Sequence, residues 1–226
     1  MRLLPYVIAL AVVGCSADTS PVNEPKQTKV STPEISAPAG LYKLDPSHAS
    51  LVFRIDHLGF SHYTANFATF DATLNFDPQS PETMSVEATI DVSSLTLPSP
   101  PDGFLSDLLG TDWFNAVTYP EIRFQSQEIT KTGPANVRVD GVMTMLGTTA
   151  PLSLDVTYIG GYAGYPPHDP NARIGFIAEG SLSRSDYGLV FGLPPEGSTM
   201  GVGDLVTFRI DGEFTGPPTE ESDQNP

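Results

Sequence analysis

Alternation of apolar and polar residues along most of the chain is the feature that most restricts its fold. Leu51, Phe53 and Ile55 occupy every second position of residues 51–56. Successive side chains of a β-strand point to opposite faces, so this period of two predicts a strand with one buried face. The same period marks seven further segments: 63–76, 84–92, 122–125, 137–145, 152–158, 174–178 and 206–214. The chain is therefore predicted to be all-β, with about eight antiparallel strands joined by turns rich in glycine, proline and asparagine.

The alternation changes phase within residues 63–76, the segment that follows 51–56 in the chain. Residues 58–61 interrupt the pattern, and the phase shifts by one position around Ala68 and Thr69. A shift of one residue moves every later side chain to the opposite face, so it predicts a β-bulge or a sharp bend. Such features curl a sheet towards closure. We therefore expect an eight-stranded barrel whose interior is filled by side chains or holds one elongated ligand, with a sandwich of two sheets as the alternative.

One short segment has helical instead of strand periodicity. Phe104, Leu105, Leu108 and Leu109 fall at helical spacing within residues 102–109, after two prolines. A helix of about two turns is marginal in water by itself. We therefore expect it to pack over an open end of the sheet.

The two ends of the chain differ in composition from its middle. Residues 1–15 have one basic residue, a short apolar run and then a cysteine, which indicates an export signal too short to span a bilayer. Cys15 is the predicted lipidation site, because the residues before it look like the lipobox of bacterial lipoproteins. Residues 16–40 are predicted to be a disordered tether, 41–216 the folded domain, and 217–226 a disordered acidic tail.

The composition restricts the class of partner. Acidic residues number 27 and basic residues 11, which gives a formal net charge of −16. Such a charge argues against nucleic acid and anionic membrane surfaces as electrostatic partners. Contact with a membrane is therefore expected through a lipid anchor or through apolar groups. The sequence sets no expectation for the oligomeric state.

A series of short motifs resembles the YceI-like family and covers the chain from Leu41 to about Phe214. The motifs include HLGFS at 57–61, DWF at 112–114, YPEIRF at 119–124, LGTT at 146–149 and RSDYG at 184–188. The resemblance implies an extended, lipocalin-like antiparallel β-barrel that holds a polyisoprenoid chain, such as a quinone tail or a polyprenyl lipid. It also implies export to the periplasm and no enzymatic activity. Ser16 after the cysteine favours the outer membrane.

One stretch departs from the family pattern. The family usually has an Arg-Asp-x-His-Leu run before the DWF motif, whereas Asp107 stands here at the histidine position and the arginine has no counterpart. The polar group bound by other members is therefore not carried over to this chain.

The predicted ligand-binding residues are apolar side chains on the inward parity of the strands. No catalytic residue, metal ligand or cofactor is expected, apart from a bound polyisoprenoid or quinone. Trp113 and Tyr187 are placed near the mouth. The predicted lining consists of Phe53, Ile55, Phe67, Ile90, Trp113, Phe124, Met143, Met145, Phe176, Tyr187 and Phe208.

Two other functions remain open from the sequence. One is a metal-dependent or acid/base enzyme that uses His48 and His57. The other is an envelope scaffold with a solidly packed interior. Arg184 and Asp186 of the RSDYG motif are expected either to orient the head group of a ligand or to form structural ion pairs.

Overall fold

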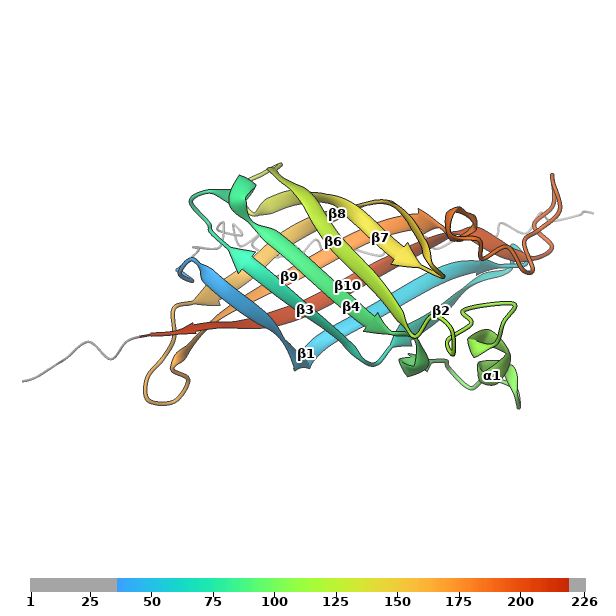
Figure 1. Cartoon of the computed structure of the whole chain (residues 1–226), viewed down its shortest axis with the longest axis horizontal. Coiled ribbons are helices and arrows are strands. Elements are labelled where there is room, and N and C mark those ends of the chain that lie inside the picture. The colour runs from blue at the N-terminus through green and yellow to red at the C-terminus, as the bar shows by residue number, and fades with distance from the viewer. Residues whose placement is uncertain (1–35, 220–226) are drawn as a thin grey trace, which may run out of the picture. The chain divides into compact units, whose positions relative to one another are not determined.

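The strands form one antiparallel sheet that closes on itself in the computed structural model, which describes residues 36–219. β1 (Gly40–His57) pairs with β10 (Val202–Pro218), and this pairing closes the barrel (Figure 1). The closed ring runs β1-β10-β9-β8-β7-β6-β4-β3 and returns to β1. The other strands are β2 (Ser61–Phe67), β3 (Phe70–Phe76), β4 (Ser85–Asp91), β5 (Leu95–Thr96), β6 (Glu121–Lys131), β7 (Asn136–Met145), β8 (Thr148–Tyr162) and β9 (Asn171–Ser183). The predicted eight-stranded barrel is confirmed, and the sandwich is excluded.

Strand β1 is long because it pairs with two strands on one side. Its first residues pair with β3, and the part from Leu51 to His57 pairs with β2. The chain bends between β2 and β3, where the Ala68 N–H donates to the Ser94 carbonyl at 3.0 Å. This bend lies at the predicted phase change. The bend lets β3 continue the barrel wall, while β2 pairs with the C-terminal part of β1.

The turn between β1 and β2 requires unusual backbone angles. Leu58 and Gly59 have φ angles of 60° and 69°, as a type I′ hairpin turn requires. A Cβ atom at Gly59 would lie 2.8 Å from Thr199 Oγ1 in the loop before β10. This turn therefore packs closely against that loop, which forms part of the same end of the barrel.

The only α-helix in the described part of the chain is α1 (Phe104–Leu109), as the apolar spacing predicts. Leu108 is buried in the larger of two core clusters. Figure 1 places α1 at one end of the barrel, beyond the end of β4. Residues 36–219 also contain three short 3₁₀ helices: η1 (Pro81–Thr83), η2 (Val92–Ser94) and η3 (Arg184–Tyr187).

Gly141 on β7 is expected to be intolerant of any side chain. A Cβ atom there would lie 2.7 Å from the Cζ atom of Phe124 and would clash with the Gln125 carbonyl. We expect Gly141→Ala to lower the free energy of unfolding by about 1–3 kcal/mol, measured by urea titration. Gly160→Ala on β8 is the matched control, since nothing lies within 4 Å of its Cβ position. Equal effects of the two substitutions would contradict this account.

Candidate functional site

The barrel encloses a cavity of about 650 Å³. All eight strands of the closed ring contribute to its wall, because their inward side chains do not meet at the axis. The lining is almost entirely aliphatic and aromatic, with Arg184, His57 and Ser99 as its charged or strongly polar members. The alternative of a solidly packed interior is therefore wrong.

The cavity wall contains ten of the eleven residues predicted to line it. Tyr187 is the exception: it is buried, yet it is not among the lining residues. Tyr187 ends the 3₁₀ helix η3, where a period of two does not give the direction of a side chain. The predicted residues found in the wall are Phe53, Ile55, Phe67, Ile90, Trp113, Phe124, Met143, Met145, Phe176 and Phe208.

The cavity reaches the surface at the end that carries α1. Among its lining residues, the exposed ones are His57, Pro98, Ser99 and Pro101. His57 ends β1, and the other three lie in the loop before α1. We call this end the mouth. Periodicity could not assign the residues of this loop to the cavity wall, because a proline-rich connection has no regular alternation.

The opposite end of the cavity is closed by aromatic rings. Tyr42, Phe76, Tyr158, Phe176 and Phe214 form four edge-to-face contacts with centroids 5.6–6.2 Å apart. Such pairs contribute about 0.5–1.5 kcal/mol each beyond the area they bury. Burial raises the pKa of Tyr42 to about 12, so its hydroxyl stays neutral. The cavity is therefore a blind, apolar tunnel.

Arg184 is a buried cation at the mouth, with 2% of its surface exposed. Its Nε donates to the Gly203 carbonyl at 2.8 Å, and its Nη2 donates to that of Val202 at 2.9 Å. Its Nη1 donates to the carbonyls of Leu189 and Phe191 at 2.7 and 2.9 Å. One guanidinium thus joins the segment after η3 to the start of β10 and fixes the loop between them.

The surroundings of Arg184 do not contain the structural ion pair that was one of the two expectations for the RSDYG motif. Its guanidinium carbon lies 5.4 Å from the centroid of the Trp113 ring, a cation–π contact. Its hydrogen bonds go to main-chain carbonyls instead of carboxylates. Asp204 accepts from the N–H and hydroxyl of Ser185 at 2.9 and 2.8 Å. The motif therefore builds the mouth, and most of the donors of Arg184 are engaged within the chain.

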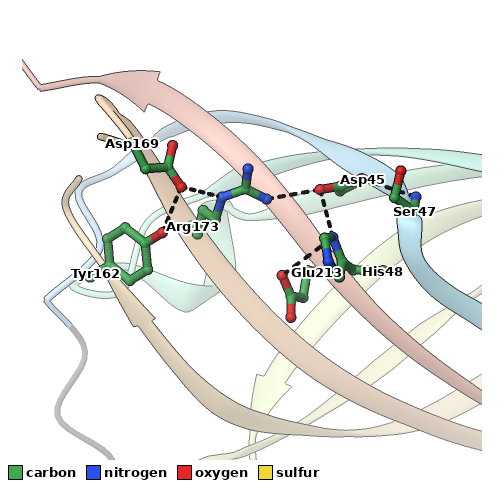
Figure 2. A network of polar contacts seen from close by, with 7 residues as sticks. All are labelled: Asp45, Ser47, His48, Tyr162, Asp169, Arg173 and Glu213. Atoms are coloured by element: carbon green, nitrogen blue, oxygen red, sulfur yellow. Dashed lines mark hydrogen bonds and ion pairs between the residues drawn. The ribbon is translucent and has the colours of Figure 1, made fainter. Parts of the chain in front are cut away.

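A polar network lies on the outer surface near the closed end (Figure 2). Residues 45–48 of β1 bulge outward and lie opposite a single residue of β10, Glu213. Within this bulge, His48 Nδ1 lies 3.0 Å from Asp45 Oδ2 and 4.0 Å from Glu213 Oε2. The bulge thus gathers three titratable groups at the β1–β10 closure.

Arg173 of β9 joins this bulge to the β8–β9 hairpin. Its Nη1 lies 2.8 Å from Asp45 Oδ2, and its Nε lies 2.6 Å from Asp169 Oδ2. The Tyr162 hydroxyl donates to the same Asp169 oxygen at 2.7 Å. These contacts connect β1, β8, β9 and the hairpin on the outside of the barrel, away from the apolar tunnel.

The network predicts a pH window for stability. The hydrogen bonds from His48 and then Arg173 hold the pKa of Asp45 well below its usual range, whereas the bond to Asp45 raises the pKa of His48. The Asp45 contribution is present above its unfolded pKa of about 3.9 and is lost as pH falls through the folded value. The His48 contribution is present below about pH 6.5 and is lost as pH rises through the folded value.

We therefore expect His48→Gln to lower the melting temperature most between about pH 4 and 6.5. The difference from the unsubstituted protein should shrink at alkaline pH, where His48 is neutral in both states. Melting curves across this range test the prediction, with His62→Gln on the exposed start of β2 as the control. A difference that stays constant with pH would contradict it.

The two histidines of the enzyme alternative do not form one site. His48 lies in the network near the closed end, and His57 lies at the mouth. Nine residues along β1 place them roughly 30 Å apart at about 3.3 Å per residue. Within residues 36–219, no group of three or more His, Cys, Asp or Glu side chains is arranged so that it could hold a metal ion, and the contacts among Asp45, His48 and Glu213 do not form such a group. Asp107 is exposed on α1.

The predicted signal, the lipidation site, residues 16–35 of the predicted tether and residues 220–226 of the predicted tail fall outside the described part. Within it, Ala37 is buried, β1 begins at Gly40 and β10 continues to Pro218, so the folded domain extends a few residues beyond the predicted 41–216 at both ends. Cys15 therefore stays a sequence-based expectation, as does the export of the chain. Among the helices of residues 36–219, none is long and apolar enough to cross a membrane.

Comparison with known proteins gives consistent matches over the barrel. The YceI-like domain matches residues 42–214. A UPF0312 protein of Photorhabdus laumondii is 36% identical over 168 residues, which cover 71% of this chain and 82% of that protein. BcnA of Burkholderia cenocepacia has the same fold, with a TM-score of 0.64 and 24% identity over 75% of this chain and 98% of that one. A polyisoprenoid-binding domain from Saccharophagus degradans has a TM-score of 0.58 and 14% identity over 78% and 98% of the two chains.

Proposed function

The chain belongs to the YceI-like family, and from this premise we propose that its barrel binds a polyisoprenoid or a similar apolar lipid for storage or transport. The observation that carries this proposal is the blind, apolar tunnel with a mouth at one end. The Saccharophagus degradans domain, which is described as polyisoprenoid-binding, has the same fold and supports the ligand class.

The size of the tunnel suits an extended apolar chain. A volume of about 650 Å³ lies well within the roughly 300–1,000 Å³ of ligand pockets. Burying an isoprene unit of five carbons contributes a few kcal/mol at about 25 cal/mol per Å² of apolar surface. Several units offset the roughly 4–15 kcal/mol that association costs. Burial of the tail alone is therefore sufficient for binding.

The arrangement of polar groups orients the ligand. Aromatic and aliphatic side chains line the closed end, whereas His57 and Ser99 lie at the mouth. The apolar tail of a ligand therefore enters the tunnel first, and any polar head group stays near the surface, where water can solvate it. Because most donors of Arg184 bind main-chain carbonyls, the proposed binding does not depend on a buried ion pair with the head group.

We place this activity at the bacterial envelope, with Cys15 as the anchor, on the basis of the N-terminal sequence. Acyl chains on that cysteine would hold the protein stably at a membrane, the outer membrane in the proposal. A labelled fatty acid that is incorporated into the native chain but not into Cys15→Ser would support the anchor.

The ligand is tested on protein purified from its own membranes in mild detergent. Organic extraction followed by mass spectrometry is expected to release an apolar isoprenoid-type lipid at up to one molecule per barrel. Protein that contains no lipid and takes up neither a quinone nor a polyprenol on incubation would overturn the proposed function.

A further inference from the structure

We propose that the mouth end of the barrel docks onto a bilayer of neutral, zwitterionic lipid, so that an apolar ligand passes from the bilayer into the tunnel. This inference rests on the proposed function, because it concerns the route by which the same cavity is filled. The contact surface is the mouth rim, defined as Phe60, Val190, Phe191 and Met200.

The mouth rim is a group of exposed apolar side chains carried by two adjacent loops. Phe60 is 78% exposed and Met200 60% exposed, and Val190 and Phe191 are also more than half exposed. The loops are joined by a hydrogen bond of 2.9 Å from the Leu58 N–H to the Gly201 carbonyl. Single exposed apolar residues are ordinary, but a gathered set marks an interaction surface.

The rim continues into the tunnel through apolar contacts. The Phe191 ring packs against the Trp113 ring, with centroids 5.4 Å apart. Trp113 and Leu189 line the tunnel, and Arg184 binds the carbonyls of Leu189 and Phe191. The rim is therefore fixed in place beside the opening. A hydrocarbon tail that leaves a bilayer at the rim reaches the tunnel along an apolar surface.

The charge around the mouth selects the kind of surface. Residues 58–63, 97–120 and 186–203 contain no lysine or arginine, whereas five of their residues are acidic: Asp102, Asp107, Asp112, Asp186 and Glu196. Anionic lipid would be repelled by these carboxylates and would find no cationic partner in these segments. Burial of the apolar rim is the attraction that remains, and it suits zwitterionic lipid.

The closed end of the barrel makes a poor docking surface. Leu41 and Tyr165 are exposed there, but the ion pairs of Arg173 also lie at that end (Figure 2). The chain enters the domain at this end, where the Ser36 hydroxyl donates to the Gly161 carbonyl. A bilayer at this end would meet charged groups and the aromatic closure instead of an opening.

Trp113 gives a direct test because it is the only tryptophan of the chain and packs against the rim. The full chain is mixed with vesicles of phosphatidylcholine whose acyl chains carry bromine, a short-range quencher. We expect quenching of Trp113 emission, and less of it when phosphatidylglycerol replaces part of the phosphatidylcholine. Vesicle binding that leaves Trp113 unquenched, as attachment through residues 1–15 alone would, overturns the proposal.

Substitutions at the two ends separate the docking surface from the rest of the chain. Phe60→Ser and Met200→Ser are each expected to weaken vesicle binding by about tenfold, as the loss of one buried apolar side chain implies. Leu41→Ser and Tyr165→Ser at the closed end are matched controls and should bind like the unsubstituted chain. Loss of binding in the controls but not in the rim variants overturns the proposal.

A failure of the docking proposal can be distinguished from a failure of the proposed function. Phe60 and Met200 do not line the tunnel. Their serine variants should therefore still take up a polyprenol supplied in detergent. If the protein binds no lipid in detergent, the proposed function is refuted. The quenching of Trp113 tests the docking surface independently of that result.

Discussion

Ala88→Trp is expected to abolish lipid retention while the barrel stays folded. Ala88 of β4 lines the tunnel and lies between Ala72 on β3 and Phe124 on β6. An indole there occupies space that is open in the native barrel, so it displaces ligand more than it displaces neighbouring strands. A ligand that can no longer bury several of its isoprene units in the tunnel should bind at least about 100-fold more weakly. Mass spectrometry of lipid retained after incubation with a polyprenol measures the loss.

The matched control is Glu87→Trp, one residue earlier on the same strand. Glu87 is exposed, and its side chain points to the opposite face of the sheet from that of Ala88. This variant should retain lipid like the native protein. If Ala88→Trp keeps a native circular dichroism spectrum and also retains lipid normally, the tunnel is not the binding site.

Arg184→Leu is expected to destabilise the protein more than any surface substitution. It leaves four carbonyls at the mouth without their donor, two of them from Leu189 and Phe191. A buried carbonyl that loses its partner costs about 1–3 kcal/mol, and water entering the mouth relieves part of this. We expect the free energy of unfolding to fall by about 3–6 kcal/mol in urea titrations.

Two further variants test the cause of this loss. Arg184→Lys should recover only part of the stability, because a lysine has three donors and lacks the planar fork of a guanidinium. Arg209→Leu removes an exposed arginine that pairs with Asp211 and Glu179, and it should lower the free energy of unfolding far less, because solvent screens exposed ion pairs. Equal losses for Arg184→Leu and Arg209→Leu would show that the carbonyl contacts do not matter.

Much of the fold was predictable because strand periodicity survives in the sequence. The phase change at Ala68 and Thr69 predicted a bend that the structure contains between β2 and β3. The early start of β1 at Gly40 was not predicted, since the bulge at residues 45–48 breaks its alternation. The bulge is set by side-chain pairs across strands, such as Asp45 with Arg173, which are 128 residues apart.

The position of the site was predictable to the extent that parity gives the inner face of a strand. Phe53 and Ile55 could be assigned to the interior, but Tyr187 could not, because it follows a strand. Whether inward side chains meet depends on the diameter and tilt of the closed barrel, which no local pattern contains. The role of Arg184 was equally hidden, because its partners are main-chain carbonyls and leave no mark on side-chain identity.

The pairing of β1 with β10 has a consequence for biogenesis. Leu51 lies opposite Ile210, so the barrel cannot shut until nearly the whole domain has been synthesised. Contacts between positions so distant in sequence slow folding, because a long loop must be closed before they form. Until then, the apolar inner face and two unpaired strand edges are exposed, so the incomplete chain is prone to aggregate. We therefore expect chains truncated before residue 202 to require a holdase chaperone to remain in solution.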